Sequence, residues 1–237
     1  MPAAQHAPTP THASPDLTEE LDRQIQVLVD LGYPALLDRT ERQLRDALEP
    51  LRDVVARLRP DPASAADPDD HVPFVVVVDG LDLATAAGRM SLAGRPARLM
   101  LTAAEIPQYL PIEAVRVPDG VPLGCSSEAS GPRAYLLSDV DTGSEFCNIT
   151  PETALREIVA RGRTPLTIAE GVALVTQRPD MLRKNRCFSL AGSRRGDQRV
   201  PAIWISERAP KLGWCWDRNP HTWLGTTSAG ARTSPLS

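Results

Sequence analysis

The chain has 237 residues, of which 42% are hydrophobic and 24% charged, and its formal net charge is −4. This length predicts one sizeable domain, or one domain with a helical appendage. The apolar fraction is too high, and the net charge too small, for a wholly disordered chain. No apolar run approaches the roughly 18 residues of a membrane helix, and residues 1–15 lack the basic and apolar regions of a secretion signal. We therefore expect a soluble, cytoplasmic protein that does not enter a membrane.

The N-terminal part of the chain has the pattern of a helical hairpin. Residues 1–15 are expected to be a disordered tail. Apolar residues then recur with helical spacing over 17–31, where Gly32 and Pro34 end the helix. A second apolar stripe runs over 44–58 behind Thr40 as N-cap, and Pro50 should kink this helix or start a new one within it. We expect the hairpin, residues 16–59, to pack on the main body or on a second copy, with self-association through residues 17–59.

The predicted main domain covers residues 73–227. Residues 60–72, rich in proline and acid, form the expected linker, and residues 228–237 a flexible tail. The β-branched run at 74–78 indicates a buried strand, and 98–101 a further strand; helices are expected at 150–162 and 167–177. Predicted hairpins join 134–140 to 145–149, 187–193 to 199–206, and 212–216 to 221–226. The fold class is therefore α+β, with a mainly antiparallel sheet body.

Scarce residue types gather toward the C-terminus. Five of the ten aromatic residues, including all four tryptophans, fall within residues 188–223. Residues 161–218 hold 12 cationic and 5 acidic side chains, whereas residues 16–160 are acidic. Across a 212–216/221–226 hairpin, Trp214, Trp216, Trp223 and His221 would share one face. Because cations beside aromatic rings suit flat or anionic ligands, this face is the leading candidate site. Its basic members are Lys184, Arg186, Arg194, Arg195 and Lys211.

Cysteine and histidine offer a second hypothesis. Cys187 or Cys215 could form a thiolate–imidazole pair with His221. In the predicted hairpin, however, Cys215 points away from His221, and compact zinc-ligand spacings are absent. We expect neither a metal nor a cofactor, and four reduced thiols as the default.

Two short motifs are better explained as turns. Residues 141–144 match the Asp-Thr-Gly-Ser tetrapeptide of aspartic proteases, but a monomeric enzyme would need a second copy, which this chain lacks. A dimer could supply that copy, although turn chemistry explains the tetrapeptide without a site. Residues 78–80 resemble the strand-end aspartate of nucleotide hydrolases, yet no phosphate-binding glycine loop accompanies them. Neither motif therefore predicts a catalytic site.

Four further stretches carry a resemblance to a known family. They are Arg161–Thr167, Lys184–Leu190, Pro210–Trp216 and Asn219–Gly225. With them the chain resembles, from Leu21 to about Gly225, a family of uncharacterised actinobacterial proteins classified as a domain of unknown function. The resemblance implies a cytoplasmic bacterial protein and a GC-rich genome, in agreement with 24 arginines against 2 lysines. It implies no catalytic role.

The leading functional hypothesis is a binding or regulatory protein that holds a small anionic or planar ligand on the tryptophan face. The alternatives are a Cys/His-dependent hydrolase or group transferase, and a structural interaction protein whose tryptophans are core. Double-stranded nucleic acid is not an expected partner, because the acidic remainder of the chain would repel a long polyanion.

Overall fold

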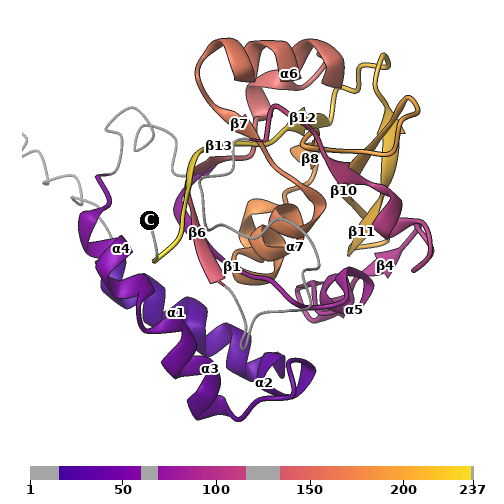
Figure 1. Ribbon diagram of the computed structural model, residues 1–237. Coiled ribbons are helices and arrows are strands. Elements are labelled where there is room, and N and C mark those ends of the chain that lie inside the picture. Colours follow the sequence, from indigo (N-terminus) through magenta and orange to yellow (C-terminus); the bar gives the residue numbers. More distant parts are fainter. Residues whose placement is uncertain (1–15, 60–68, 116–133, 236–237) are drawn as a thin grey trace, which may run out of the picture.

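The computed structural model describes residues 16–59, 69–115 and 134–235. Helix α7 (Ile168–Gln177) lies between two main sheets, and four N-terminal helices cover one side of the molecule (Figure 1). The chain is therefore α+β, as the sequence predicts. None of the described helices is long and apolar enough to cross a membrane.

The N-terminal helices begin and end at the expected signals. Asp16 caps the first helix through the Thr18 amide, Gly32 follows it with φ +78°, and Thr40 forms a capping box with Gln43. Pro50 divides the second stripe into two helices, because proline cannot donate the bond that would continue the first. The four helices are α1 (Leu17–Asp30), α2 (Tyr33–Leu36), α3 (Glu41–Leu48) and α4 (Leu51–Arg57).

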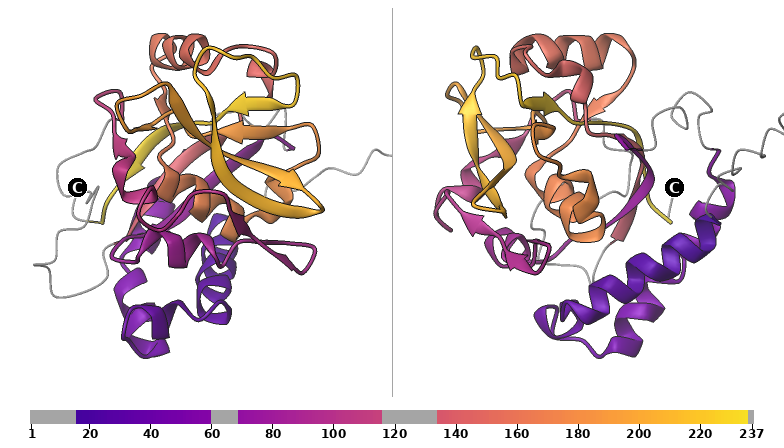
Figure 2. Two further views of the ribbon diagram at one scale, coloured as in Figure 1. Left: turned by 90° about the vertical axis from the view of Figure 1, so that its right-hand side faces the viewer. Right: turned by 180° about the vertical axis from the view of Figure 1, so that it is seen from behind.

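The apolar stripes of these helices pack on the first sheet of the same chain (Figure 2). Leu21 and Ile25 join a core with Phe74, and the buried Gln24 side chain bonds the sheet backbone at Phe74 O and Val76 N. The apolar surface behind the self-association prediction is thus covered within one chain.

The first sheet has the strand order β1-β6-β13-β7, and its described pairings are antiparallel. Its central strand β6 pairs with β1 on one side and with β13 on the other. The strands are β1 (His71–Val78), β6 (Ala134–Asp141), β7 (Thr164–Pro165) and β13 (Ser228–Thr233).

Two predicted boundaries are wrong. Residues 228–235 are not a flexible tail, because β13 is an inner strand of this sheet and its Arg232 is buried. Its small residues gave no hydrophobic signal, and the arginine is paired inside the core. The predicted linker ends before residue 70, since Asp70 is buried and β1 begins at His71. The predicted tail 1–15 and linker residues 60–68 lie outside the described residues.

The second sheet has the strand order β12-β8-β10-β11-β4. Strand β8 pairs antiparallel with β10, as predicted, whereas β12 joins β8 in parallel. The strands are β4 (Arg98–Leu99), β8 (Cys187–Ser189), β10 (Arg199–Ser206), β11 (Ala209–Trp216) and β12 (Leu224–Thr226).

Two of the three predicted hairpins are wrong. Strand β11 pairs with β10 rather than with 221–226, through a turn at Glu207 and Arg208 that both have positive φ. Such a turn favours Asn-Gly or Asp-Gly, so Glu-Arg gave no hairpin signal. Residues 145–149 form no strand. The 3₁₀ helix η3 (Ser144–Phe146) begins directly after Gly143 and overlaps the start of this range.

The remaining elements lie between the strands of the two main sheets along the chain, and among them β2 pairs with β3 and β5 with β9 in two small two-stranded sheets. Helix α6 begins at the predicted Thr150 cap and Pro151. The set comprises α5 (Leu83–Ala87), α6 (Pro151–Ala160), β2 (Ser91–Leu92), β3 (Arg95–Pro96), β5 (Leu110–Pro111), β9 (Ser193–Arg194), η2 (Ile106–Gln108) and η4 (Pro179–Met181).

Candidate functional site

The tryptophans surround one small pocket on the second sheet. Trp214, Trp216, His221 and Trp223 line a pocket of about 250 Å³, together with Ala202, Trp204, Cys215 and Leu224. The sequence therefore grouped four side chains correctly, although through a wrong strand pairing. We call this pocket the tryptophan pocket.

Ring contacts order the tryptophan pocket. Trp214 and Trp216 meet edge to face with ring centroids 4.8 Å apart, and His221 lies 5.2 Å from Trp223. The Arg199 guanidinium lies 4.6 Å from the Trp214 ring centroid, a cation–π distance. Trp216 is 47% exposed, so the pocket faces solvent and is not ordinary core.

The five basic residues predicted beside the tryptophans do not line this pocket. Arg186 pairs with Asp70, Arg194 with Asp217, and Arg195 with Asp197. Lys211 lies 3.8 Å from Glu207, and Lys184 is exposed. Most of the positive charge that the sequence assigned to the ligand is thus neutralised by acidic side chains of the same chain.

The three cysteines among the described residues, Cys147, Cys187 and Cys215, lack the character of nucleophiles. Burial raises the pKa of the Cys215 thiol to about 12 and also raises the pKa values of the Cys187 and Cys147 thiols. The Cys187 thiol donates to the Arg183 carbonyl at 3.5 Å. Although Cys215 and His221 both line the tryptophan pocket, a thiol with this pKa stays protonated at neutral pH. Among residues 16–59, 69–115 and 134–235, no three His, Cys, Asp or Glu side chains group as metal ligands.

The Asp-Thr-Gly-Ser tetrapeptide builds a buried polar cluster. The Asp141 carboxylate accepts from the Gly143 amide at 2.6 Å, and the Thr142 and Ser144 hydroxyls donate to Asp70. Arg183 and Arg186 also pair with Asp70. Burial disfavours the ionised form, but bonds from Ser144 and Thr142 and the Arg183 charge hold the pKa of Asp70 below its usual range. These contacts support a structural role for the motif.

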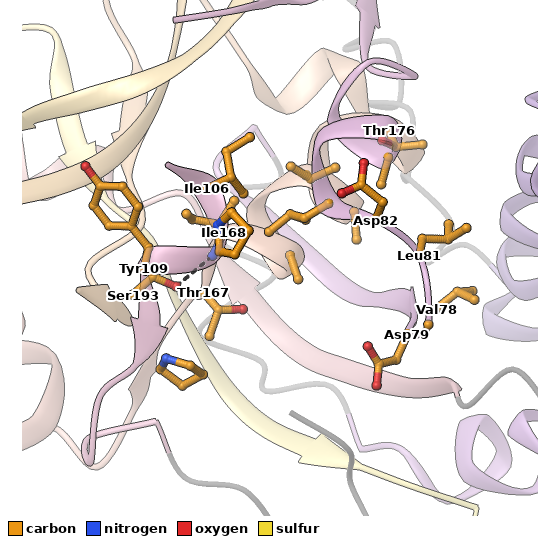
Figure 3. A pocket seen from close by; sticks show the side chains of 18 of the residues that line it. Val78, Asp79, Leu81, Asp82, Ile106, Tyr109, Thr167, Ile168, Thr176 and Ser193 are labelled. Atoms are coloured by element: carbon orange, nitrogen blue, oxygen red, sulfur yellow. Dashed lines mark hydrogen bonds between the residues drawn. The ribbon is translucent and has the colours of Figure 1, made fainter. Parts of the chain in front are cut away.

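A larger cavity, about 730 Å³, lies beside helix α7, and Figure 3 shows its lining. It was not anticipated from the sequence. One face of α7 borders it, because positions four residues apart share a helix face. The other walls come from helices α1, α2 and α5, the end of strand β1, and residues 106–111. We call it the α7 cavity; its lining residues on α7 are Ile168, Ala169, Val172, Ala173, Thr176 and Gln177.

The α7 cavity lining contains one buried polar side chain, Gln177, that lacks partners among the described residues. Gln177 is 1% exposed, and neither the nitrogen nor the oxygen of its side-chain amide forms a hydrogen bond with any described residue. The Tyr109 hydroxyl, by contrast, interacts with the Arg195 guanidinium, and the Thr176 hydroxyl with the Tyr33 hydroxyl. An unmade bond of the kind found at Gln177 costs about 1–3 kcal/mol for each buried group. Sequence reasoning missed this residue, and the one available signal was a glutamine ending an apolar helix.

Charge in the α7 cavity lining is acidic. Asp79 follows strand β1, and Asp82 caps α5 by accepting from the amide and hydroxyl of Thr85 on the same oxygen, Oδ2. These bonds lower the pKa of Asp82. No lysine, arginine or histidine of the described residues lines the cavity. Exposed Gly80, Asp82 and Leu110 border its solvent side.

Comparisons with known proteins show a family and no activity. No curated protein matches the chain, and no solved structure matches it. A family model described as "Family of unknown function (DUF5701)" matches residues 27–235, which span both sheets and all but the start of the helical layer. The chain therefore belongs to this family of unknown function.

Proposed function

We propose that this protein binds a small apolar molecule in the α7 cavity. The observation that carries the proposal is the Gln177 amide, which is buried in the cavity lining with both of its polar atoms unpartnered among the described residues. A ligand that offers one acceptor and one donor would supply both missing bonds.

The shape and chemistry of the cavity support this function. Its volume of about 730 Å³ lies within the roughly 300–1,000 Å³ of small-molecule sites. Ile106, Ile168 and Val172 are buried apolar side chains that a ligand would contact. Mostly apolar walls with a few polar groups are typical of such sites, because the walls supply affinity and the polar groups set orientation.

Filling the cavity should weaken binding. N-phenyl-1-naphthylamine is a neutral apolar probe whose fluorescence rises in apolar surroundings, and we expect saturable binding to the full chain. Ala173→Phe places a ring in the cavity and should weaken that binding at least about tenfold. Ala160→Phe, at the exposed end of α6, is the matched control and should not change it. Equal binding to the wild type and a folded Ala173→Phe variant would refute the proposal.

Replacing the buried amide separates a ligand role from a structural one. Gln177→Leu removes two unpartnered polar atoms at similar volume, so the thermal midpoint of the ligand-free protein should stay level or rise. A fall of several degrees would show that Gln177 stabilises the fold through its amide, which contradicts a side chain held for a ligand.

The tryptophan pocket supports a second candidate function, the binding of a planar or anionic ligand. It is favoured by the exposure of Trp216 and by the Arg199 guanidinium beside Trp214. Titration with adenosine monophosphate should quench tryptophan fluorescence saturably, and Trp216→Ala should weaken binding at least about fivefold. Val159→Ala, at an exposed apolar residue of α6, is the control. Quenching that does not saturate would remove this candidate.

The proposal also includes where the protein works. We place it in the cytoplasm of an actinobacterium, which the excess of arginine over lysine supports. Cys147, Cys187 and Cys215 are free thiols in the described structure, in keeping with a reducing compartment. A Cys/His-dependent enzyme is not part of the proposal, because the raised thiol pKa values oppose thiolate formation.

A further inference from the structure

Gln177 has an unbonded side chain in surroundings where the neighbouring polar groups are bonded. Its backbone carbonyl accepts from the Arg23 guanidinium at 3.1 Å, and the Thr176 hydroxyl beside it interacts with the Tyr33 hydroxyl. The Gln177 side-chain amide is 1% exposed in residue terms, and both of its polar atoms lack partners among the described residues. The chain therefore supplies partners for every other polar group named at this end of α7, but none for this amide.

The polar side chains on the other side of the α7 cavity are also bonded within the chain. Figure 3 shows Tyr109, Thr167 and Ser193 on the side away from Thr176. The Tyr109 hydroxyl interacts with Arg195, and the Thr167 hydroxyl belongs to the capping box of α7. The Ser193 hydroxyl oxygen accepts from the first backbone amide of α7 at 3.1 Å, as the dashed line marks. Polar recognition of an occupant therefore depends mainly on Gln177.

A carboxamide imposes a geometry on its partner. Its oxygen accepts and its NH₂ group donates, and the two lie side by side in one plane. Two bonds to one molecule therefore require a donor and an acceptor on neighbouring atoms of one edge. Glutamine binds adenine in DNA with two such bonds, to N6 and N7. Primary amides and lactams carry the same pair as an N–H beside a C=O.

Other common polar groups leave one atom of Gln177 without a bond. An ionised carboxylate or phosphate offers acceptors only, and the described lining contains no lysine, arginine or histidine to balance its charge. An ammonium group offers donors only. A hydroxyl has a single oxygen for both bonds, so it cannot align with the two amide atoms at once. Each unmade bond at a buried group weakens binding.

We infer that the ligand of the α7 cavity is a neutral apolar molecule that ends in a primary amide or lactam edge, paired with the Gln177 side chain through two hydrogen bonds. Its apolar body would contact Ile106, Ile168 and Val172, which are buried in the lining. This inference rests on the proposed binding function and goes further by naming the polar group of the ligand. Fatty acids and alkyl amines are excluded as the preferred class.

Two amides that differ only in their N–H groups test the inference. Octanamide and N,N-dimethyloctanamide have the same chain and the same carbonyl acceptor, but the second has no donor. Each would compete with N-phenyl-1-naphthylamine for the full-length protein. We expect octanamide to displace the probe at a concentration at least about tenfold lower, although its analogue has more apolar surface. Octanoic acid and octan-1-ol should also be weaker than octanamide. Equal or stronger displacement by the dimethyl amide or by the acid would overturn the inference.

A variant at Gln177 locates the preference. Gln177→Leu removes both polar atoms at similar volume, so the advantage of octanamide should disappear and the more apolar dimethyl amide should bind at least as well. Gln198→Leu, at an exposed glutamine outside the cavity lining, is the matched control and should keep the full advantage. If a folded Gln177→Leu variant still prefers octanamide tenfold, the pairing with Gln177 is wrong.

The two levels of the proposal fail in different ways. If the probe does not bind, or binds equally to Ala173→Phe, the binding function itself is refuted. If the probe binds and Ala173→Phe weakens its binding, but octanamide has no advantage over its dimethyl analogue, only the ligand class is refuted.

Discussion

Replacing Arg232 with methionine should lower the free energy of unfolding by about 3–5 kcal/mol, because it leaves the Glu170 carboxylate buried without its counter-charge. Both side chains are 0% exposed, and two bonds of 2.5 and 2.7 Å join them. Arg232 also donates to the Thr164 hydroxyl and the Pro165 carbonyl, which ties β13 to β7. Urea denaturation of the full chain measures the change.

A second ion pair provides the control for this prediction. Arg161, the C-cap residue of α6, pairs with Glu157 four residues before it and with Glu145, and all three side chains are at least 42% exposed. Arg161→Met should therefore change stability by less than about 1 kcal/mol. The Arg232→Met/Glu170→Gln double variant should be less destabilised than the sum of the two single variants, because neither charge is left alone. A loss below about 1 kcal/mol for Arg232→Met would contradict the assigned role.

Helix α7 depends on the same pair through its cap. The Glu170 carboxylate accepts from the Thr167 amide at 2.7 Å, and so closes the capping box that begins α7. The Tyr135 hydroxyl of β6 donates to the other oxygen at 3.1 Å. The buried Glu170 carboxylate therefore fixes the start of the helix that borders the α7 cavity. Tyr135 of β6 and Arg232 of β13 hold that carboxylate in place.

Local signals predicted α1, α3, α4, α6 and α7, because these helices carry their own boundary chemistry, whereas the short α2 and α5 were missed. The Thr40 and Thr167 capping boxes, Gly32 and Pro50 act within a few residues in the sequence, so the boundaries follow from the sequence. The strands were predicted less well. Strand β13 is held by partners far away in the sequence, Glu170 at 62 residues and β6 at about 90, and its small residues show no alternation.

The candidate sites divide in the same way. The tryptophan pocket was found because tryptophan is scarce in this chain and gathers within one stretch, even though the predicted pairing was wrong. The α7 cavity could not be predicted, because its walls come from segments as distant as Leu28 and Ser193. Asp79 was correctly placed after a strand, yet its position beside a cavity depends on how α7 packs against the first sheet.

Gly143→Ala should be the most damaging glycine substitution in the described chain, because two independent effects add. Gly143 has φ +73°, where alanine costs about 1–2 kcal/mol. An added Cβ would also lie 1.9 Å from the Thr226 carbonyl oxygen. Relieving this clash should cost about a further 1–3 kcal/mol. Gly225 of β12 lies against Gly143, so that a Cβ added at Gly225 would lie 2.1 Å from the Gly143 carbonyl oxygen. Urea denaturation should therefore show a loss of about 2–5 kcal/mol.

Gly162→Ala isolates the backbone effect. Gly162 has φ +76°, nearly the same as Gly143, but an added Cβ there meets nothing within 4 Å. Its loss should be only the 1–2 kcal/mol or so of the left-handed backbone. The difference between the two variants measures the close approach at Gly143, where β6, the Asp70 contacts and β12 meet. Equal losses of unfolding free energy in the two variants would mean that the Thr226 backbone moves away from an added Cβ at little cost. The contact between Gly143 and β12 would then not help to hold the two sheets together.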